Sequence, residues 1–188
     1  RNNLGSALHA LKRFDEAERE YRACVAMAPD YALAQFNLAS VAIDLGRFGE
    51  AEQLCREMIE RTPAAAQAYT FLGAALGHQG RLLEALECHR IAAELAPRDA
   101  QVAEVYASGL TETGRFNEGL RWFSRALALN PGSLTAHQLL GTALLSQGCL
   151  ADGWAEYGYR PAFGQFGHVY PKISISRTLP PELKGKRI

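Results

Sequence analysis

Histidine and cysteine are the residue types in this chain that could bind a metal ion or supply a nucleophile with its base. The histidines form no His-Glu-x-x-His motif and no pair four residues apart, so none of them makes the ligand pair of a helical zinc site. They are scattered along the chain at His9, His78, His89, His137 and His168. We therefore expect no metal site.

The cysteines also argue against a reactive centre. They form no Cys-x-x-Cys pair, and their spacing is typical neither of a zinc site nor of a small disulfide framework. Their positions are Cys24, Cys55, Cys88 and Cys149. The chain also lacks Gly-x-Ser-x-Gly, Walker and Gly-x-Gly-x-x-Gly motifs. We expect reduced thiols in a cytoplasmic protein, with no cofactor and no catalytic residue within residues 1–160.

Composition and charge narrow the class of partner. The 188 residues include 20 Lys and Arg against 20 Asp and Glu, which is not the basic excess of a nucleic-acid-binding protein. No apolar run approaches the roughly 20 residues that span a bilayer. Glu16, Glu18 and Glu20 lie among arginines, which is typical of a solvent-exposed face. We expect a protein or peptide partner, no nucleic acid and no membrane span.

A repeat of 34 residues organises the chain. Its clearest mark is a proline at this interval, at Pro29, Pro63, Pro97 and Pro131. A small residue stands 24 positions before each proline, at Gly5, Ala39, Gly73 and Ala107, and Gly141 continues the series. Another stands 12 positions before, at Ala17, Ala51, Ala85 and Gly119, and Gly153 continues it. Large side chains at these positions would overpack two closely approaching helices.

Each unit is expected to hold two helices, because apolar residues fall at three- and four-residue steps on either side of a breaker. The breaker is Gly46, Gly80, Gly114 or Gly148, where a left-handed residue ends the first helix, and the first unit has Lys12 there instead. Just after the prolines, Asp30, Asp99 and Ser133 are expected to cap the next helix. The third unit, with Ala64, Ala65 and Ala66, lacks such a cap.

This pattern resembles the tetratricopeptide repeat, a helix-turn-helix unit with Leu-Gly, Ala, an aromatic residue, another Ala and a closing Pro. The resemblance implies an all-α, right-handed superhelical solenoid of about five repeats, at about residues 1–31, 32–65, 66–99, 100–133 and 134–160. Cys55 and His89 replace the expected aromatic residue, and Gly119 replaces Ala. We expect these departures to loosen the second to fourth units, and we expect His89 to be a core or interfacial residue.

Stacked helix pairs would form a concave face lined by the first helices, where solenoids bind their partners. By resemblance to the family, the inward stripe carries Asn3, Ser6, Phe36, Asn37, Ser40, Asp44, Thr70, Phe71, His78, Gln101, Glu104, Ser108, Gln138 and Thr142. Asn3 and Asn37 stand at the same repeat position and resemble the Asn ladder of O-linked N-acetylglucosamine transferases, whose side-chain amides hold an extended peptide. Alternatively, these asparagines are solvated or intrahelical polar residues.

The repeat pattern ends after Arg160, where prolines and glycines interrupt residues 161–188. We expect an irregular connector, with Ile173–Ser176 able to form a short strand if another strand pairs with it. Gly153-Trp154, Tyr157 and Arg160, followed by Leu183, Gly185 and Lys186, resemble the junction of bacterial tetratricopeptide proteins that continue into a glycosyltransferase-like domain. The alternative is that Trp154 and Tyr157 are the packing face of a final helix before a disordered tail.

Three functional hypotheses follow. The chain is a scaffold that binds an extended partner segment in the concave groove, or the substrate-recognition arm of a glycosyltransferase whose catalytic part lies beyond Ile188, or a bridge that uses its convex face near Arg19 and Glu57. For the first, Asn37→Ala with Phe71→Ala should weaken capture without changing melting. Solenoid ends often self-associate through unfilled helix faces, so a dimer is a further expectation.

Overall fold

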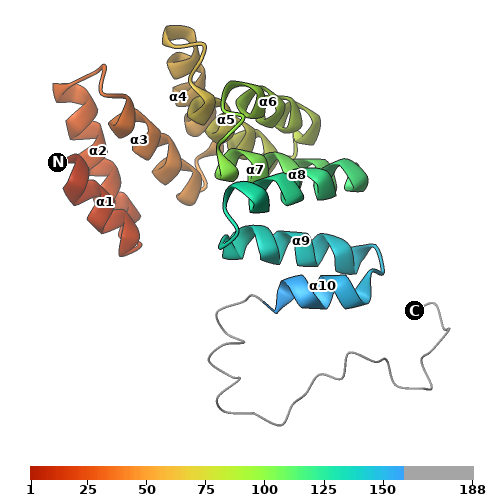
Figure 1. The fold of residues 1–188 in the computed structure, drawn as a ribbon. Helices are drawn as coiled ribbons and strands as arrows, with labels where there is room; N and C mark the ends of the chain where they lie inside the picture. The colour runs from red at the N-terminus through yellow and green to blue at the C-terminus, as the bar shows by residue number, and fades with distance from the viewer. Residues whose placement is uncertain (159–188) are drawn as a thin grey trace, which may run out of the picture. The chain divides into compact units, whose positions relative to one another are not determined.

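The computed structural model describes residues 1–158, which form ten helices (Figure 1). They are α1 (Asn2–Ala10), α2 (Phe14–Met27), α3 (Ala32–Asp44), α4 (Phe48–Arg61), α5 (Ala66–His78), α6 (Leu82–Leu95), α7 (Ala100–Glu112), α8 (Phe116–Leu129), α9 (Leu134–Ser146) and α10 (Leu150–Tyr157). The chain divides into two compact units, of which the first is Arg1–Leu129 and the second begins at Asn130. The expected connector, residues 161–188, lies outside the described residues.

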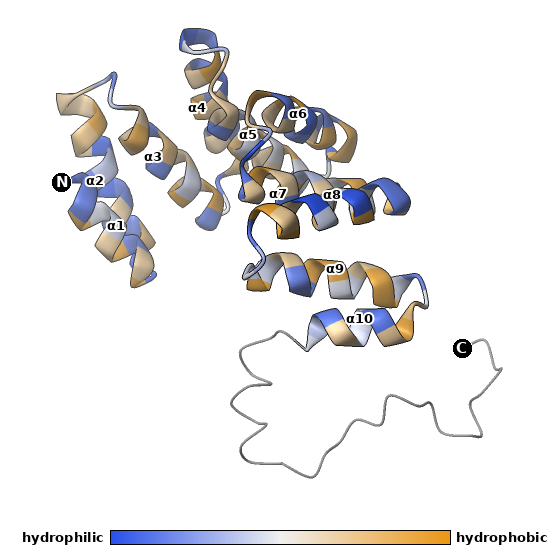
Figure 2. Ribbon diagram, in the orientation of Figure 1, coloured by the Kyte–Doolittle hydropathy of each residue, from blue (hydrophilic) through white to orange (hydrophobic). Residues whose placement is uncertain are grey.

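Helical hairpins build the first unit. Each first helix packs against the helix that follows it, and α2 packs on α3, α4 on α5 and α6 on α7. Every helix carries both apolar and polar residues, so each can bury one side and expose the other (Figure 2). The second unit contains one further hairpin, α9 with α10. The expectation of an all-α helical repeat solenoid is confirmed.

The residue between the two helices of a hairpin has a left-handed backbone in every repeat. Gly46, Gly80, Gly114 and Gly148 have φ between +74° and +82°, and Lys12 has φ +58° at the equivalent position. The predicted breaker is therefore confirmed, including its replacement in the first repeat. A side chain with a Cβ atom is disfavoured in this conformation, so Lys12 carries a local strain that the glycines avoid.

We expect Lys12→Gly to stabilise the chain by about 1 kcal/mol, because it removes the left-handed strain of a residue with a Cβ atom. Lys12 is exposed, so little packing is lost. Gly46→Ala is the matched control and should shift stability in the opposite direction. Urea unfolding of both variants measures the two effects; a Lys12→Gly variant less stable than the parent chain would contradict the explanation.

Close approach of the paired helices explains the small residues of the repeat. A Cβ atom on Gly5 would lie 2.6 Å from Cε1 of Tyr21, and one on Gly73 would lie 2.3 Å from Cε1 of His89. In the second repeat the facing residue is the smaller Cys55, which is fully buried, and Ala39 stands where the glycine would be. In these three repeats a glycine accompanies a large facing residue and an alanine accompanies a small one. The fourth repeat departs from this pattern, because Ala107 accompanies the buried Phe123.

The third departure from the repeat pattern also has a packing explanation. A Cβ atom on Gly119 would lie 2.5 Å from the Thr111 methyl group and 3.1 Å from the Ala107 carbonyl oxygen. Thr111 therefore occupies the space that an alanine at position 119 would need. His89 is buried, as expected for a core histidine.

The cap prediction is correct at two helices and wrong at a third. Asp99 accepts hydrogen bonds from the backbone N–H groups of Gln101 and Val102, and Ser133 accepts one from that of Ala136. Asp30 does not cap α3, because that helix begins after Tyr31, which makes no side-chain cap. The cap stands two residues after the repeat proline, and Asp30 stands one residue after it. α5 begins after Ala65, also without a side-chain cap, as expected.

Candidate partner-binding surface

The first helices of the first three repeats lie side by side, with α1 against α3 and α3 against α5 (Figure 1). Their expected partner-binding residues form what we call the first-helix stripe: Asn3, Ser6, Phe36, Asn37, Ser40, Asp44, Thr70, Phe71 and His78. Asn3, Ser6, Asp44 and His78 are exposed, and the others are half-buried. None of the nine is fully buried, so each retains surface that a partner can reach.

The Asn37 amide is joined to the neighbouring helix. Its Nδ2 donates a hydrogen bond of 2.9 Å to Oδ1 of Asn2, whereas Asn3 is exposed. The structure thus pairs Asn37 with Asn2 and not with the residue at the same repeat position. Sequence reasoning missed Asn2, although it occupies the repeat position of Phe36 and Thr70. One N–H and the carbonyl oxygen of Asn37 remain as further hydrogen-bonding capacity.

The hydroxyl groups of Ser6 and Thr70 on the stripe donate hydrogen bonds to the protein itself. Ser6 Oγ donates to the Asn2 carbonyl at 3.1 Å and accepts from the Tyr21 hydroxyl at 3.3 Å. Thr70 Oγ1 donates to the Ala66 carbonyl at 3.2 Å. Since a hydroxyl has one donor hydrogen, these groups can offer a partner only acceptor lone pairs.

Two phenylalanines make the middle of the stripe apolar. The rings of Phe36 and Phe71 lie 6.3 Å apart, and both pack against the buried core cluster around Leu72 and Cys55. Phe71→Ala would therefore remove core packing as well as stripe surface. The expectation that Asn37→Ala with Phe71→Ala leaves melting unchanged is inconsistent with this packing, and a binding test needs other positions.

At the end of the stripe that lies near the turns, Asp44 and His78 each contact a neighbouring side chain. His9 Nε2 lies 2.7 Å from the Asp44 carboxylate, and the His78 ring stacks on Phe48 with centroids 4.7 Å apart. His9 was not expected on this surface, although it lies one position before Ala10, the residue at the repeat position of Asp44. These contacts orient Asp44 and His78, which are both exposed.

The remaining expected residues lie on later helices. On α7, Gln101 is exposed, Glu104 is buried, and Ser108 donates a hydrogen bond of 3.0 Å to Glu112. Gln138 and Thr142 lie on α9, in the second compact unit, and are exposed. Thr142 donates to the Gln138 carbonyl of its own helix.

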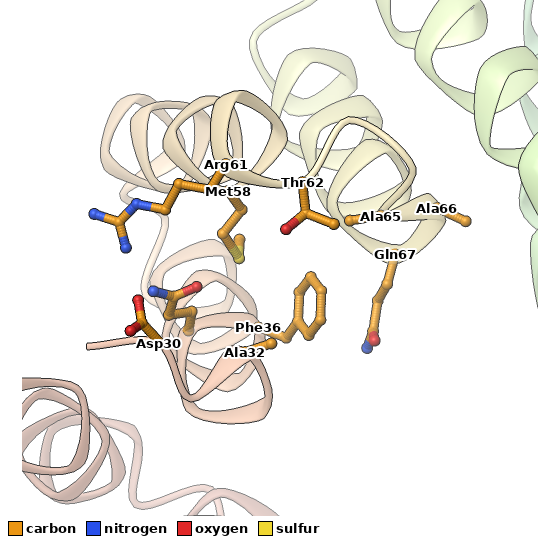
Figure 3. A pocket seen from close by; sticks show the side chains of 10 residues that line it. Asp30, Ala32, Phe36, Met58, Arg61, Thr62, Ala65, Ala66 and Gln67 are labelled. Carbon is orange, nitrogen blue, oxygen red and sulfur yellow. The ribbon is translucent and has the colours of Figure 1, made fainter. Parts of the chain in front are cut away.

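A cavity of about 580 Å³ opens between α3, the end of α4 and the start of α5 (Figure 3). We call it the Met58 pocket. Phe36, Met58, Ala65 and Ala66 supply its apolar lining, and Asp30, Arg61 and Gln67 are among its polar residues. Phe36 belongs to both the pocket and the first-helix stripe, so the two surfaces are continuous. Sequence reasoning did not find this pocket.

Buried carboxylates join successive repeats. The expectation of a solvent-exposed salt-bridged face holds for Glu16, which is exposed and pairs with Arg13, but it is wrong for Glu18. Glu18 is buried and accepts from Arg22 at 2.9 Å and from Arg47 of the next repeat at 2.7 Å. Glu52 occupies the same position one repeat later and accepts from Arg81 at 2.7 Å. The Gln79 amide, with Arg81 and Arg56, lowers the pKa of Glu52 despite its burial. These pairs fix the register between repeats.

All four cysteines are free thiols, and burial suppresses the ionisation of two of them. Burial raises the pKa of Cys55 to about 12 and that of Cys88 to about 11. Cys149 is exposed and Cys24 is half-buried. Because only the thiolate is nucleophilic, Cys55 and Cys88 are unreactive at neutral pH.

We expect iodoacetamide to alkylate Cys149 first and Cys55 last, because exposure and ionisation both limit the reaction. Peptide mass spectrometry after timed alkylation measures the order. The same reaction in denaturant is the control and should bring the rates together. Labelling of Cys55 as fast as that of Cys149 in the folded chain would contradict its burial.

Residues 1–158 contain no group of three His, Cys, Asp or Glu side chains placed to hold a metal ion. Within the same residues, no helix has the length and apolar character to cross a membrane.

Comparison with known proteins agrees with this architecture. A tetratricopeptide repeat family model matches residues 2–66. No curated protein matches the chain. TTC0263, a thermophilic tetratricopeptide protein of Thermus thermophilus, superposes with a TM-score of 0.77 at 23% identity, covering 92% of this chain and 91% of that one.

Two further structures are similar. Pseudomonas aeruginosa PilF superposes with a TM-score of 0.71 at 19% identity, covering 87% of this chain and 73% of that one. YrrB, described as a tetratricopeptide protein with an unusual peptide-binding site, has a TM-score of 0.60 at 17% identity, with 90% of each chain covered. The chain therefore has the fold of tetratricopeptide-repeat proteins, and its residues 2–66 match the model of that family.

Proposed function

We propose that this chain is a protein-interaction scaffold whose first-helix stripe binds an extended segment of a partner protein. The observation that supports the proposal is the continuity of the stripe across α1, α3 and α5. The Asn37–Asn2 hydrogen bond links α1 to α3, and the Phe36–Phe71 contact links α3 to α5. Accessible polar and aromatic side chains thus follow one another across three repeats.

The chemistry of the stripe suits a main chain with apolar side chains. The Asn37 amide can donate to a carbonyl and accept from an N–H group, and the serine and threonine oxygens can accept from further N–H groups. Phe36 and Phe71 offer half-buried aromatic surface, which favours apolar contacts. YrrB, a protein of the same fold, is described as having a peptide-binding site, which is consistent with this use of the architecture.

The test selects peptides from a phage-displayed random library on the immobilised chain and measures a synthetic selected peptide by fluorescence anisotropy. Ser40→Arg with Ala74→Arg places one long cationic side chain at Ser40 of the stripe and a second at Ala74, the residue at the same repeat position on α5. Both positions are half-buried. We expect this variant to bind the peptide at least about tenfold more weakly, since a loss of about 1.4 kcal/mol changes affinity tenfold. Thermal unfolding of the variant shows whether the fold is retained.

Arg19→Ala with Glu57→Ala is the matched control. Both side chains are exposed and lie on the second helices α2 and α4, away from the stripe. The stripe proposal expects normal binding by this variant. Binding that is lost in the control and kept in the stripe variant would instead support a bridge that uses the convex face.

The alternative proposal, a recognition arm of a glycosyltransferase, is supported by the motif at the last hairpin. Trp154 is 51% exposed, whereas Glu18, Glu52 and Leu86 at its repeat position are buried and Leu120 is half-buried. Its ring meets that of Tyr157 edge to face at 5.6 Å. The remainder of the motif lies outside the described residues. Coding sequence after Ile188 that specifies an apolar strand, a glycine-rich turn and a helix would support this alternative, and a stop codon would exclude it.

We also propose that a second copy of the chain can cover the outer face of α1. Leu4 is 53% exposed, whereas Leu38 and Leu72 at the same repeat position are 4% and 7% exposed. Residues of α2 pack against Leu38 and cover it. Leu11, which follows α1 and lies seven residues after Leu4, adds a second leucine to the same face and is 68% exposed.

We expect Leu4→Glu with Leu11→Glu to weaken self-association, because charged side chains replace the exposed apolar surface. Sedimentation equilibrium over a range of concentrations measures the effect as a fall in apparent mass towards that of the monomer. Leu83→Glu, at an exposed leucine of α6, is the control and should behave as the parent chain does. A parent chain that remains monomeric at all concentrations would contradict the proposal.

A further inference from the structure

The Met58 pocket combines an apolar interior with charged groups on one side. Figure 3 shows the Met58 side chain and the Phe36 ring directed into the cavity, with Arg61 and Asp30 on the same side of it. Its volume of about 580 Å³ falls within the range of about 300–1,000 Å³ typical of ligand sites. An apolar cavity with a few polar groups is the usual form of a ligand-binding site.

The positive charge of Arg61 has no counterpart at the equivalent position of the first, third and fourth repeats. The residues at the repeat position of Arg61 are Met27, Leu95 and Leu129, all apolar. A position that only completes the helix end needs no guanidinium, as those three residues show. Arg61 is therefore a local departure from the repeat, placed beside the pocket.

The two charged groups are available to a partner. Among residues 1–158, neither the Arg61 guanidinium nor the Asp30 carboxylate makes an ion pair or a side-chain hydrogen bond with another residue. The repeated arginines Arg47 and Arg81, by contrast, each pair with a buried glutamate. The Gln35 amide beside the pocket is engaged, because it donates to the Pro29 carbonyl.

Of the two groups, Arg61 is better placed to select a charge on a partner. Its guanidinium extends away from the helix, whereas the shorter Asp30 side chain stays near the backbone at the start of α3 (Figure 3). A guanidinium can also bind a carboxylate through two parallel hydrogen bonds, which adds directional selectivity.

We propose that the Met58 pocket receives an apolar side chain of the partner's extended segment, and that Arg61 pairs with an acidic side chain next to it. This inference rests on the proposed function and specifies the class of sequence that the scaffold selects. Phe36 lies in both the stripe and the pocket, so one segment can run along the stripe and place a side chain in the cavity. The recognised feature is an Asp or Glu adjacent to a large apolar residue.

The experiment uses synthetic fluorescent peptides derived from the phage selection, with the full chain and its Arg61→Glu variant. We expect the selected sequences to share an apolar residue beside Asp or Glu. Replacing the acidic residue by Lys should weaken binding to the parent chain about tenfold or more, and Arg61→Glu should weaken binding of the acidic peptide similarly. The Lys peptide should regain affinity for Arg61→Glu, because the charges are then exchanged.

Arg19→Glu is the matched control, since it makes the same charge reversal at an exposed residue of α2 outside the pocket. It should leave peptide binding unchanged. Arg61 is itself exposed at the last residue of α4, so its substitution removes no buried side chain. Thermal unfolding of each variant is measured alongside binding.

The outcomes separate this inference from the proposed function. Binding that depends on Ser40 and Ala74 but not on Arg61 would overturn the inference and leave the scaffold proposal intact. Selection of Lys or Arg beside the apolar residue, with binding lost in Asp30→Lys, would overturn it in favour of Asp30 as the selecting group. Failure to select any peptide would overturn both.

Discussion

Gly73→Ala is expected to destabilise the chain by about 2 kcal/mol or more, a typical cost of adding a methyl group to a filled core. The new Cβ atom would lie 2.3 Å from Cε1, 2.5 Å from Nδ1 and 2.8 Å from Nε2 of His89. His89 is buried between its neighbours, so its ring cannot swing into solvent without losing core packing. Urea unfolding at neutral pH measures the loss.

The second repeat provides a compensating pair for this substitution. Ala39 and Cys55 occupy the positions of Gly73 and His89, and both are fully buried. Gly73→Ala with His89→Cys would reproduce that pair in the third repeat. We expect the double variant to be more stable than the sum of the single effects predicts, by about 1 kcal/mol or more, as contacting residues usually couple. Strictly additive effects would contradict the claim that the two positions are matched in size.

Acidification is expected to destabilise the chain through His89. Burial lowers the pKa of His89 from 6.5 to about 4, and its Nδ1 has no hydrogen-bond partner among the described residues. The unfolded chain therefore takes up a proton at this residue below about pH 6.5, while the folded chain resists protonation until about pH 4. Full stability is present above pH 6.5 and is lost as the pH falls, with a loss of about 2 kcal/mol at pH 5.

His89→Phe isolates this effect. The residue at the same repeat position in the fourth repeat is Phe123, which is 1% exposed, and Gly73 leaves more room than the Ala107 that faces Phe123. A phenylalanine should therefore fit, and it cannot titrate. Urea unfolding of both proteins at pH 7.5 and pH 5 should show a smaller loss in the variant, with the other titrating groups common to both. An equal loss in the two proteins would contradict the role of His89.

The repeat itself could be predicted from the sequence, because each helix pair depends on a few residues at fixed intervals. The left-handed glycines, the left-handed Lys12 and the caps at Asp99 and Ser133 all follow from local backbone requirements. The prediction that Asp30 caps α3 was wrong, because Asp30 lies one residue before the capping position, which Tyr31 occupies. The start of each helix is fixed by its position in the repeat and not by residue type alone.

The candidate surface could be predicted only in part, because its details depend on contacts between repeats. Position in the repeat placed Asn37 and Phe71 on the surface, but it did not show that Asn37 pairs with Asn2 or that Phe71 packs in the core. The burial of Glu18 requires Arg47, which lies 29 residues away. A comparison of equivalent positions would have singled out Arg61, the charged residue among Met27, Leu95 and Leu129.

The most direct test of partner binding is to titrate the isotope-labelled chain with a selected peptide and follow its backbone amide resonances. If the segment lies along the first helices, the largest shifts will occur near Ser40 on α3 and near Phe71 and His78 on α5, with little change at Arg19 on α2. Shifts confined to the second helices α2, α4 and α6, with the first helices unaffected, would contradict the account.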